Sequence, residues 1–274
     1  MKSWSCSRLV LLSCLAAVPM QLARAEILKV GGTGSSAPLV ANLFEAFRKQ
    51  VPGVELEQPS PPLGSGGALK ALAGGRLDLA FAGRPLKPDE EARVGPSFKL
   101  ATTPFVLASA GGRKQDGFTR DELAGVYAGT RAAWDNGAPI RLVLRASFES
   151  DTEVLRAMSP AMAAAVDVAA RRPGMAMGQD DLETLTLLTR TPGSLGPTTL
   201  GLLRGMGSPL TLFAIDGVTP SLANLQNGRY VWRKDMIVVL SRQPTPLAKK
   251  FAAFLRSEKA RAVLLRYDYL PLEE

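Results

Sequence analysis

The sequence predicts an α/β protein in which a mainly parallel sheet is flanked by helices. Between residues 26 and 82, strand-like and helix-like segments alternate in the order strand, helix, strand, helix, strand. Turns rich in glycine and serine join several of them. The chain has 274 residues, of which 46% are hydrophobic and 21% charged, enough for one large domain or for two lobes of ordinary size.

The first 25 residues (1–25) have the pattern of a cleavable secretory signal. Lys2 and Arg8 precede or border an apolar run at 9–20, and an A-x-A sequence at 23–25 precedes Glu26. The apolar run is too short to span a bilayer. We therefore expect export to the periplasm and a mature chain that begins at Glu26.

A lipoprotein signal is the alternative, because residues 11–14 loosely resemble a lipobox ending at Cys14. Cys6 and Cys14 are the two cysteines of the chain, and both lie within the predicted signal. The mature chain would then have no disulfide and would depend on its hydrophobic core for stability.

The chain contains no histidine. The Ser-His-Asp triad, the Cys-His pair and the usual zinc sites are therefore absent, so we expect no enzyme activity, no metal and no cofactor. The chain has 33 basic and 25 acidic residues, but the basic ones are scattered and aromatic residues make up only 6%. This composition argues against nucleic-acid binding and favours recruitment of a small anion.

The first half of the mature chain contains the alternating segments. After a strand at 26–31, Ser35 or Ser36 is the expected N-cap of a helix at 37–50 that has Pro38 in its first turn. Strands are further predicted at 54–57, 77–82 and 102–110, with a short helix at 68–73 and a turn into a polar helix after residue 83.

The composition changes abruptly at 111–117, which we interpret as the crossing into a second lobe. An apolar strand at 236–240 is interpreted as the return crossing. We therefore predict a first lobe from 26–110 and 231–274 and a second lobe at 111–230. Strands are predicted at 140–144, 194–199 and 210–215, and helices at 119–127, 152–158, 160–171, 180–189, 221–228, 244–255 and 258–265.

Three short polar loops, at 32–36, 64–67 and 145–152, follow strand-like or apolar runs and precede helix-like ones. Such loops place backbone N–H groups, small hydroxyls and the positive end of a helix dipole together, which suits an anion. Arg145 either lies under that anion or is a surface charge. Asp151 either orients Arg145 or caps a helix.

Two nucleotide-binding patterns are weaker alternatives. Gly32, Gly34 and Ala37 fit a dinucleotide fingerprint with Glu55 about twenty residues later, but the predicted export and the serines of this loop argue against it. The second loop lacks the Lys-Ser/Thr ending of a nucleotide-binding phosphate loop, since its lysine is Lys70.

Several motifs in order resemble the phosphate-binding protein family of bacterial phosphate ABC transporters, in the type II periplasmic solute-binding protein class. The matching segments cover nearly all of the mature chain and lie at 32–38, 64–70, 78–86, 192–196, 214–220 and 269–272. The resemblance implies a two-lobed α/β fold, with two crossing strands as a hinge, that closes over one anion. It also implies an inner-membrane ABC permease as partner and a monomeric state.

The resemblance further implies which residues bind the anion. The Ser36 hydroxyl and the Ala37 N–H match donors of the first loop, and Ser65 and Gly66 match donors of the second. The third loop has one extra residue between Arg145 and Ser150, so its register is open. The complete set of expected ligand-binding residues is Gly34, Ser35, Ser36, Ala37, Ser65, Gly66, Arg84, Arg145, Ser150, Asp151 and Thr152.

One departure from the family pattern affects the expected ligand. The family has an aspartate that accepts the proton of monohydrogen phosphate, and this chain has Gly83 and Arg84 at that place. An arginine attracts a fully ionised oxyanion that a carboxylate would repel. Selectivity for phosphate is then relaxed, or the ligand is another oxyanion or a phosphorylated small molecule, unless Arg84 points to solvent.

The expected function is therefore capture of phosphate or a related oxyanion in an interlobe cleft for an ABC-type importer. A stand-alone anion sensor, or a degenerate binding module with no transport partner, is the alternative. An enzyme acting on phosphorylated substrates is a third possibility, against which the missing histidines argue.

Overall fold

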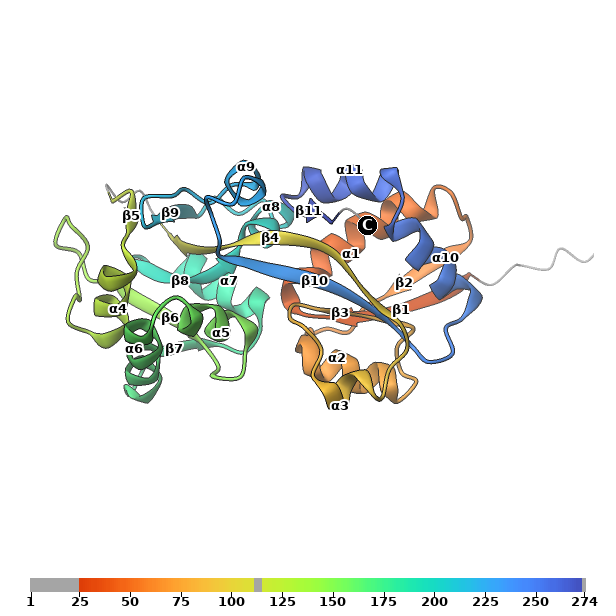
Figure 1. Cartoon of the computed structure of the whole chain (residues 1–274), viewed down its shortest axis with the longest axis horizontal. Helices are drawn as coiled ribbons and strands as arrows, with labels where there is room; N and C mark the ends of the chain where they lie inside the picture. The colour runs from red at the N-terminus through yellow and green to blue at the C-terminus, as the bar shows by residue number, and fades with distance from the viewer. Residues whose placement is uncertain (1–24, 111–114, 273–274) are drawn as a thin grey trace, which may run out of the picture.

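The computed structural model describes residues 25–110 and 115–272. Two α/β lobes lie side by side and are joined by two long strands (Figure 1). Sheets flanked by helices form both lobes, so the predicted α/β class is confirmed. The predicted signal at 1–25 and its lipobox alternative lie outside the described residues, apart from Ala25.

The first lobe is built on three parallel strands in the order β2-β1-β3, extended on the β3 side by an antiparallel β10. Helices α1, α10 and α11 cover one face, and α2 covers the other (Figure 1). The bounds are β1 (Glu26–Gly32), β2 (Val54–Glu57), β3 (Leu79–Ala82), β10 (Arg233–Leu240), α1 (Ala37–Arg48), α2 (Gly64–Ala73), α3 (Pro88–Glu91), α10 (Pro246–Leu255) and α11 (Glu258–Arg266).

The amphipathic pattern of α1 and α10 explains the core of this lobe. Phe44 and Phe47 of α1 and Phe251 and Phe254 of α10 are buried, with ring centroids 5.1 to 6.2 Å apart. Such edge and stacked ring contacts bury large apolar surfaces. The first lobe therefore has a hydrophobic core of its own.

Strands β4 (Ser97–Ser109) and β10 run antiparallel between the lobes (Figure 1). The first part of β4 pairs with β10 and β11 (Leu270–Pro271), and its last part pairs with β8 (Ser194–Thr199) and β9 (Thr211–Ile215). Phe105 and Leu107 already belong to the second core. The interpretation of 111–117 as the crossing falls partly outside the described residues, and the predicted division at 111 and 231 stays a prediction.

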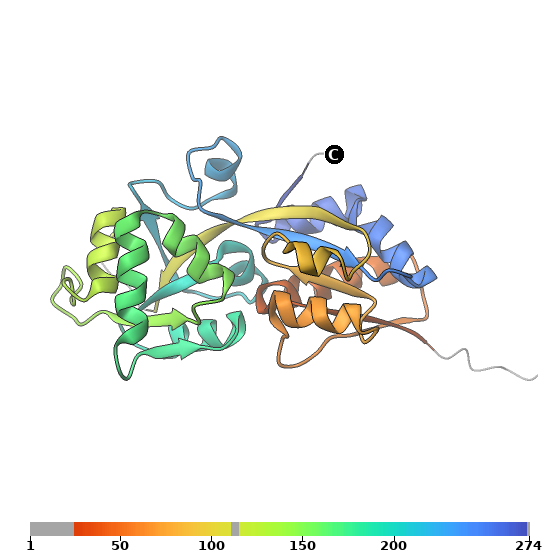
Figure 2. The same ribbon diagram turned by 60° about the horizontal axis from the view of Figure 1, so that its bottom comes forward.

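The second lobe contains the parallel strands β8, β6 and β7, with β5 paired to β9 at its other side. Helices α4, α5 and α6 lie together on one face, seen as the green helices of Figure 2, and α7 and α8 pack on the other. The bounds are β5 (Gly117–Phe118), β6 (Arg141–Arg145), β7 (Ala176–Gly178), α4 (Arg120–Ala128), α5 (Ser150–Ala157), α6 (Pro160–Arg171), α7 (Asp181–Arg190), α8 (Leu200–Gly205) and α9 (Leu222–Gln226).

Most predicted elements are present, and the differences have local causes. Helix α2 begins at Gly64, so the second polar loop forms the first turn of that helix instead of preceding it. Strands β4 and β10 begin earlier than predicted because the first residues of each pair with a later part of its antiparallel partner: 97–99 pair with 237–239, and 233–235 pair with 102–104. Sequence patterns missed β5, β7, α8 and β11, which have only two to six residues. No helix in the described ranges has the length and hydropathy needed to cross a membrane.

Gly201 in α8 is expected to tolerate no side chain. A Cβ atom there would overlap the ring of Tyr269, with Tyr269 Cδ2 only 2.9 Å away, and that ring is fully buried. Gly201→Ala should lower the free energy of unfolding by about 1–3 kcal/mol, as overpacking of a core does. Chemical denaturation measures the loss, and Gly205→Ala in the same helix, whose Cβ would meet Pro38 at 3.3 Å, should cost less.

Candidate functional site

Gly83, the residue after β3, marks the point at which separate segments converge between the lobes. A Cβ atom placed on Gly83 would lie 3.2 Å from Cγ2 of Thr33, 3.5 Å from Cε of Lys234 and 3.7 Å from Oγ of Ser150. These neighbours come from the first loop, a crossing strand and the third loop. The absence of a side chain at Gly83 allows this close approach.

The second loop reaches the same point through Ser65. The Ser65 hydroxyl accepts a hydrogen bond of 3.0 Å from the backbone N–H of Gly83. Gly64 has a φ of +68°, a conformation that favours glycine, and it starts the turn that aims Ser65 at the end of β3. All three predicted loops thus meet at the junction of the lobes.

The first loop is held mainly by its own hydroxyl groups. It forms a short 3-10 helix, η1 (Gly34–Ser36), capped by Thr33, whose Oγ1 accepts from the Ser36 N–H at 3.3 Å. The Ser36 hydroxyl donates to the Thr33 carbonyl at 2.8 Å, and the Ser35 and Thr33 hydroxyls are 2.8 Å apart. Ser36 is the N-cap residue of α1, as predicted, but its side chain makes no cap hydrogen bond to that helix.

Arg145, at the end of β6, is a buried charge and not a surface one. Its side chain is 1% exposed. Nη1 donates to the Gly178 carbonyl and to Thr184 Oγ1, both at 3.2 Å, and Nη2 donates to Glu149 Oε2 at 3.0 Å. Contacts on several sides hold the guanidinium in one orientation.

Asp151 joins Arg145 to a second buried cation, Lys234 of β10. Its Oδ2 lies 3.4 Å from Arg145 Nε, and its Oδ1 lies 2.6 Å from Lys234 Nζ. The expectation that Asp151 orients Arg145 therefore agrees with the geometry, whereas the cap position of α5 is occupied by Glu149. Burial disfavours the charged form of Lys234, but Asp151 and Asp181 together raise its pKa.

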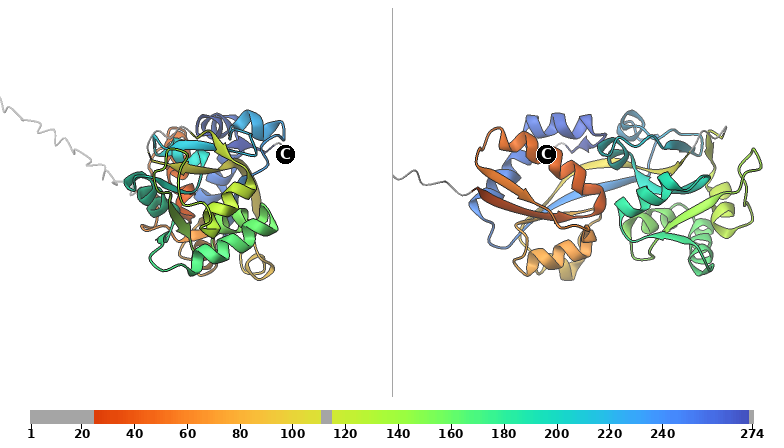
Figure 3. Two further views of the ribbon diagram at one scale, coloured as in Figure 1. Left: turned by 90° about the vertical axis from the view of Figure 1, so that its left-hand side faces the viewer. Right: turned by 180° about the vertical axis from the view of Figure 1, so that it is seen from behind.

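Asp181, the first residue of α7, brings a further carboxylate to this region. Its Oδ1 lies 3.7 Å from Lys234 Nζ, and its Oδ2 lies 3.9 Å from Arg145 Nη2. Burial disfavours its charged form, but Lys234, Arg145 and the Ser35 backbone N–H lower the pKa of Asp181 below its usual value. Helix α7 contacts η1, the short turn that follows β1, and the view from behind in Figure 3 shows the two lobes meeting side by side.

The interlobe cluster consists of five charged residues: Arg145 and Lys234 as cations, and Glu149, Asp151 and Asp181 as anions. Its formal charge is −1 when all five are ionised. Burial is the main cause that raises the pKa of Glu149, with added repulsion from Asp181 and Asp151. Among residues 25–110 and 115–272, no group of three histidine, cysteine or acidic side chains is arranged to hold a metal ion.

Arg84 is paired within its own lobe. Its two terminal nitrogens bind the two carboxylate oxygens of Glu90 at 2.7 and 2.8 Å. The hydrogen bonds to Glu90 are the largest cause that raises the pKa of Arg84. The Glu90 carboxylate offsets the positive charge of Arg84. The role of Arg84 as an anion ligand stays a prediction.

Sequence reasoning missed Lys234 and Asp181 as members of this region, and it assigned no role to Thr33 and Glu149, which lie within the first and third predicted loops. Lys234 stands at the start of an apolar strand, a position at which a lysine usually reaches solvent. Asp180 and Asp181 together have the pattern of a helix start, and Asp180 is indeed the N-cap of α7. The one available signal was the basic pair Arg233-Lys234 beside a predicted crossing strand.

A groove opens from the cluster toward solvent. It has a volume of about 290 Å³ and includes Gly83, Ser150 and Lys234 in its lining. Arg84 and Arg233 add positive charge to its walls, and Glu153 and Asp235 add negative charge. The groove is large enough for a small group attached to an anion in the site.

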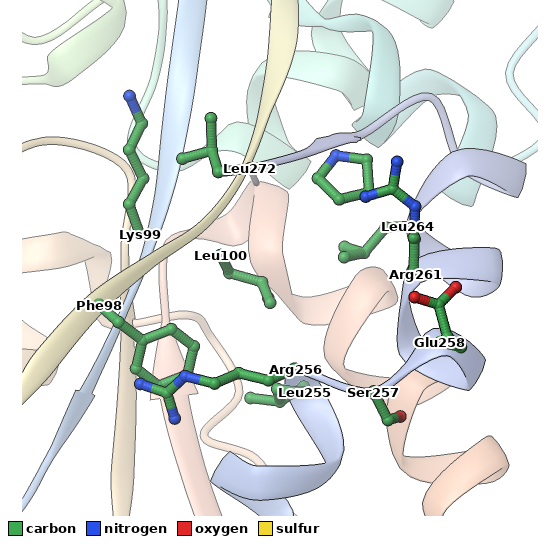
Figure 4. A pocket seen from close by; sticks show the side chains of 11 residues that line it. Phe98, Lys99, Leu100, Leu255, Arg256, Ser257, Glu258, Arg261, Leu264 and Leu272 are labelled. Carbon is green, nitrogen blue, oxygen red and sulfur yellow. The ribbon is translucent and has the colours of Figure 1, made fainter. Parts of the chain in front are cut away.

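A larger cavity, of about 500 Å³, lies on the first lobe and contains none of the three loops. It is formed by β4, α10, α11 and β11, with an apolar floor that includes Leu100 and Leu264 (Figure 4). The Arg256 guanidinium lies 3.5 Å from the centroid of the Phe98 ring. This cation–π contact covers one side of the cavity. Unlike the interlobe region, the cavity has no set of backbone N–H groups and hydroxyls from several loops that point to one place.

Comparison with known proteins agrees with this architecture. A family model described as a PBP superfamily domain matches residues 19–259. The phosphate-binding protein PstS of Bacillus subtilis is 24% identical over 258 residues, covering 90% of this chain and 81% of that protein.

Two solved structures share the fold. A protein from Clostridium perfringens, assigned to the phosphate ABC transporter substrate-binding proteins and solved with bound phosphate, has a TM-score of 0.76 and 18% identity, covering 90% of this chain and all of its own. The periplasmic molybdate-binding protein of Azotobacter vinelandii has a TM-score of 0.64 and 14% identity, with 90% and 100% covered. The family match extends over most of the chain, which therefore belongs to the periplasmic-binding-protein (PBP) superfamily.

Proposed function

We propose that this protein captures phosphate or a related oxyanion between its lobes and delivers it to an ABC-type importer. The observation that carries the proposal is the convergence of three polar loops on one buried region that also contains Arg145 and Lys234. Export to the periplasm, a monomeric state and an inner-membrane permease belong to the same proposal. No chemical step is required of the site.

The donors around Gly83 suit a small oxyanion. Backbone N–H groups of the first loop and the hydroxyls of Ser65 and Ser150 are neutral donors, and Arg145 and Lys234 supply positive charge. Hydrogen bonds to a charged group contribute roughly 1.5–3 kcal/mol each, so a few of them give micromolar binding or better. The relatives above, one named for phosphate and one for molybdate, support a tetrahedral oxyanion.

Contacts from both lobes would make the bound anion stabilise the closed state. Ser65 belongs to the first lobe, Arg145 and Ser150 to the second, and Lys234 to a crossing strand. A ligand shifts a conformational equilibrium only by its differential affinity for the two states. An anion held by both lobes has that difference, and a permease that recognises the closed form would then accept only loaded protein.

The acidic excess of the interlobe cluster favours one rival, a stand-alone sensor or degenerate module that no longer binds anions tightly. Two buried carboxylates and the half-buried Glu149 outnumber the two cations and oppose the entry of a further anion. The two functions predict different affinities of the protein for the anion. Micromolar binding favours transport, and absent binding together with a surface or membrane-kinase partner favours the rival.

Titration calorimetry of the mature chain at two pH values tests the proposal. The probes are phosphate, sulfate, molybdate and glycerol 3-phosphate, the last chosen because the groove beside Gly83 has room for an attached group. We expect micromolar or tighter binding of at least one of them, with a matching rise in melting temperature by mass action. A protein that binds none of the four would refute anion capture.

Ser150→Ala is expected to weaken anion binding by about ten- to hundredfold, because a hydrogen bond to a charged group contributes roughly 1.5–3 kcal/mol. Ser150 is buried and faces Gly83 across the lobe junction. Ser147→Ala, an exposed serine in the same loop, is the matched control and should bind as the wild type does. Equal affinities of the two variants would remove Ser150 from the site.

A further inference from the structure

Asp181 lies at a close contact between the two lobes. It belongs to the second lobe, yet a Cβ atom on Gly34 of the first lobe would be 3.0 Å from both the Cβ and the backbone nitrogen of Asp181. The same hypothetical atom would be 3.1 Å from Asp181 Oδ2. The carboxylate is therefore pressed against the first loop, which is one of the loops expected to hold an anion.

The helix to which Asp181 belongs does not need this carboxylate as a cap. Asp180 is the N-cap of α7, and its side chain accepts from the N–H groups of Leu182 and Glu183 at 2.7 and 2.9 Å. That arrangement satisfies the donors which an N-cap side chain normally serves. The position of the Asp181 carboxylate between the lobes is thus not explained by helix capping.

The partners of the Asp181 carboxylate are the groups expected to bind the ligand. Its oxygens lie 3.7 Å from Lys234 Nζ and 3.9 Å from Arg145 Nη2, and the Ser35 N–H also interacts with it. We propose that Asp181 is a built-in anion which occupies the oxyanion position in the closed, unliganded protein and which the ligand must displace. This inference rests on the proposed function, because it concerns the same site.

The two aspartates of the cluster differ in how tightly they are held. Asp151 is 2.6 Å from Lys234 Nζ, whereas Asp181 makes only the longer contacts to both cations. The Asp181 side chain is also slightly more exposed, at 7% against 2% for Asp151. Asp181 is therefore the carboxylate that leaves when another anion enters.

Charge balance requires displacement in place of simple addition. With Asp181 present, the largely buried cluster has a formal charge of −1, so an added dianion would meet net repulsion at low dielectric. When Asp181 swings out, the remaining four charges cancel. The entering anion then takes over the Ser35 N–H and the free sides of Lys234 and Arg145.

Displacement makes Asp181 a determinant of specificity. A ligand carboxylate offers two oxygens and gains little over the aspartate that it replaces. A tetrahedral oxyanion offers more oxygens and can engage donors from both lobes at once. Asp181 therefore favours phosphate-like anions over carboxylates and sets the affinity to a lower value than the donors alone would give.

Asp181→Asn tests this role, with Glu183→Gln as the matched control that removes one exposed charge from the same helix. Calorimetry with phosphate, sulfate and acetate should give at least about a tenfold gain in phosphate affinity and measurable acetate binding for Asp181→Asn only. Small-angle X-ray scattering without anion should give a larger radius of gyration for this variant than for the wild type. The reason is that the variant loses the carboxylate that attaches α7 of the second lobe to the first loop.

Two results would overturn the inference. If phosphate affinity falls, Asp181 is a ligand partner that accepts the proton of the anion, and if neither affinity nor radius of gyration changes, the contact has no role in closure. A wild type and variant that both bind no anion would refute the proposed function alone. The scattering comparison would still decide the interlobe role, since opening of the unliganded variant supports it and an unchanged radius rejects it.

Discussion

Lys234→Met is expected to destabilise the protein by about 3–5 kcal/mol near neutral pH, the usual cost of removing one partner of a buried ion pair. The Lys234 side chain is 4% exposed, and its ammonium group lies between Asp151 and Asp181. Methionine has a similar length but no charge. The variant therefore leaves two buried carboxylates with Arg145 as their remaining cation.

The loss should depend on pH, and its direction follows from the pKa shifts. In the wild type the pKa of Asp181 is lowered, so its contribution to stability is present above the unfolded pKa of about 3.8 and is lost as the pH falls through the folded pKa. Removing Lys234 raises that folded pKa. The variant can then protonate the carboxylate in mildly acid solution, and its deficit shrinks as the pH is lowered.

The wild-type Lys234 contribution adds no pH dependence in this range. Its pKa is raised above 10.5, so the stability it contributes is complete below that value and is lost only as the pH rises through the folded pKa. Denaturation at pH 7.5 and pH 4.5 measures both effects. Lys99→Met is the control, because Lys99 pairs with Asp235 at 2.7 Å but is 34% exposed, and it should cost less than about 1 kcal/mol. An equal deficit at both pH values would contradict the buried-charge explanation.

The fold was accessible to sequence reasoning wherever a local pattern was long enough. Helix α1 shows apolar residues at helical spacing, and α4 begins with a Thr119–Glu122 capping box that the structure retains. The short strand β7 and the two-residue strands β5 and β11 have too few residues for any periodicity. Their pairing is decided by neighbouring strands that are distant in sequence.

The candidate site was accessible only in part, for a related reason. The glycine- and serine-rich loops have a local signature, and the structure brings them together at Gly83. The residues that contact Arg145 could not be predicted from a local pattern. Asp181 and Lys234 come from segments 36 and 89 residues further along the chain, and neither has a local pattern that separates a buried ion pair from a solvated charge.

Gly34→Val is expected to prevent full closure of the lobes and to weaken anion binding by about a hundredfold or more. The backbone of Gly34 is not in the left-handed region, so a side chain causes no strain of its own there. The obstacle is Asp181 of the other lobe, whose Cβ and backbone nitrogen would both be 3.0 Å from the new Cβ. Backbone at the start of a helix cannot yield as a flexible side chain would.

The size of the effect follows from the population of the closed state. If a branched side chain lowers that population a hundredfold, the apparent affinity falls by the same factor, although the Gly34 N–H and all charged residues remain. Gly34→Ala should lie between the wild type and Gly34→Val. Gly66→Ala is a control in the second loop, where the nearest atoms to the added Cβ are 3.8 Å away.

Calorimetry with phosphate and scattering with and without phosphate measure the two consequences separately. If the Gly34→Val protein stays open in saturating phosphate and also binds phosphate weakly, the affinity for phosphate depends on closure of the lobes. A variant that binds as tightly as the wild type would show that the anion is held by one lobe alone. In that case the approach of Asp181 to the first loop would be a packing contact that does not contribute to binding.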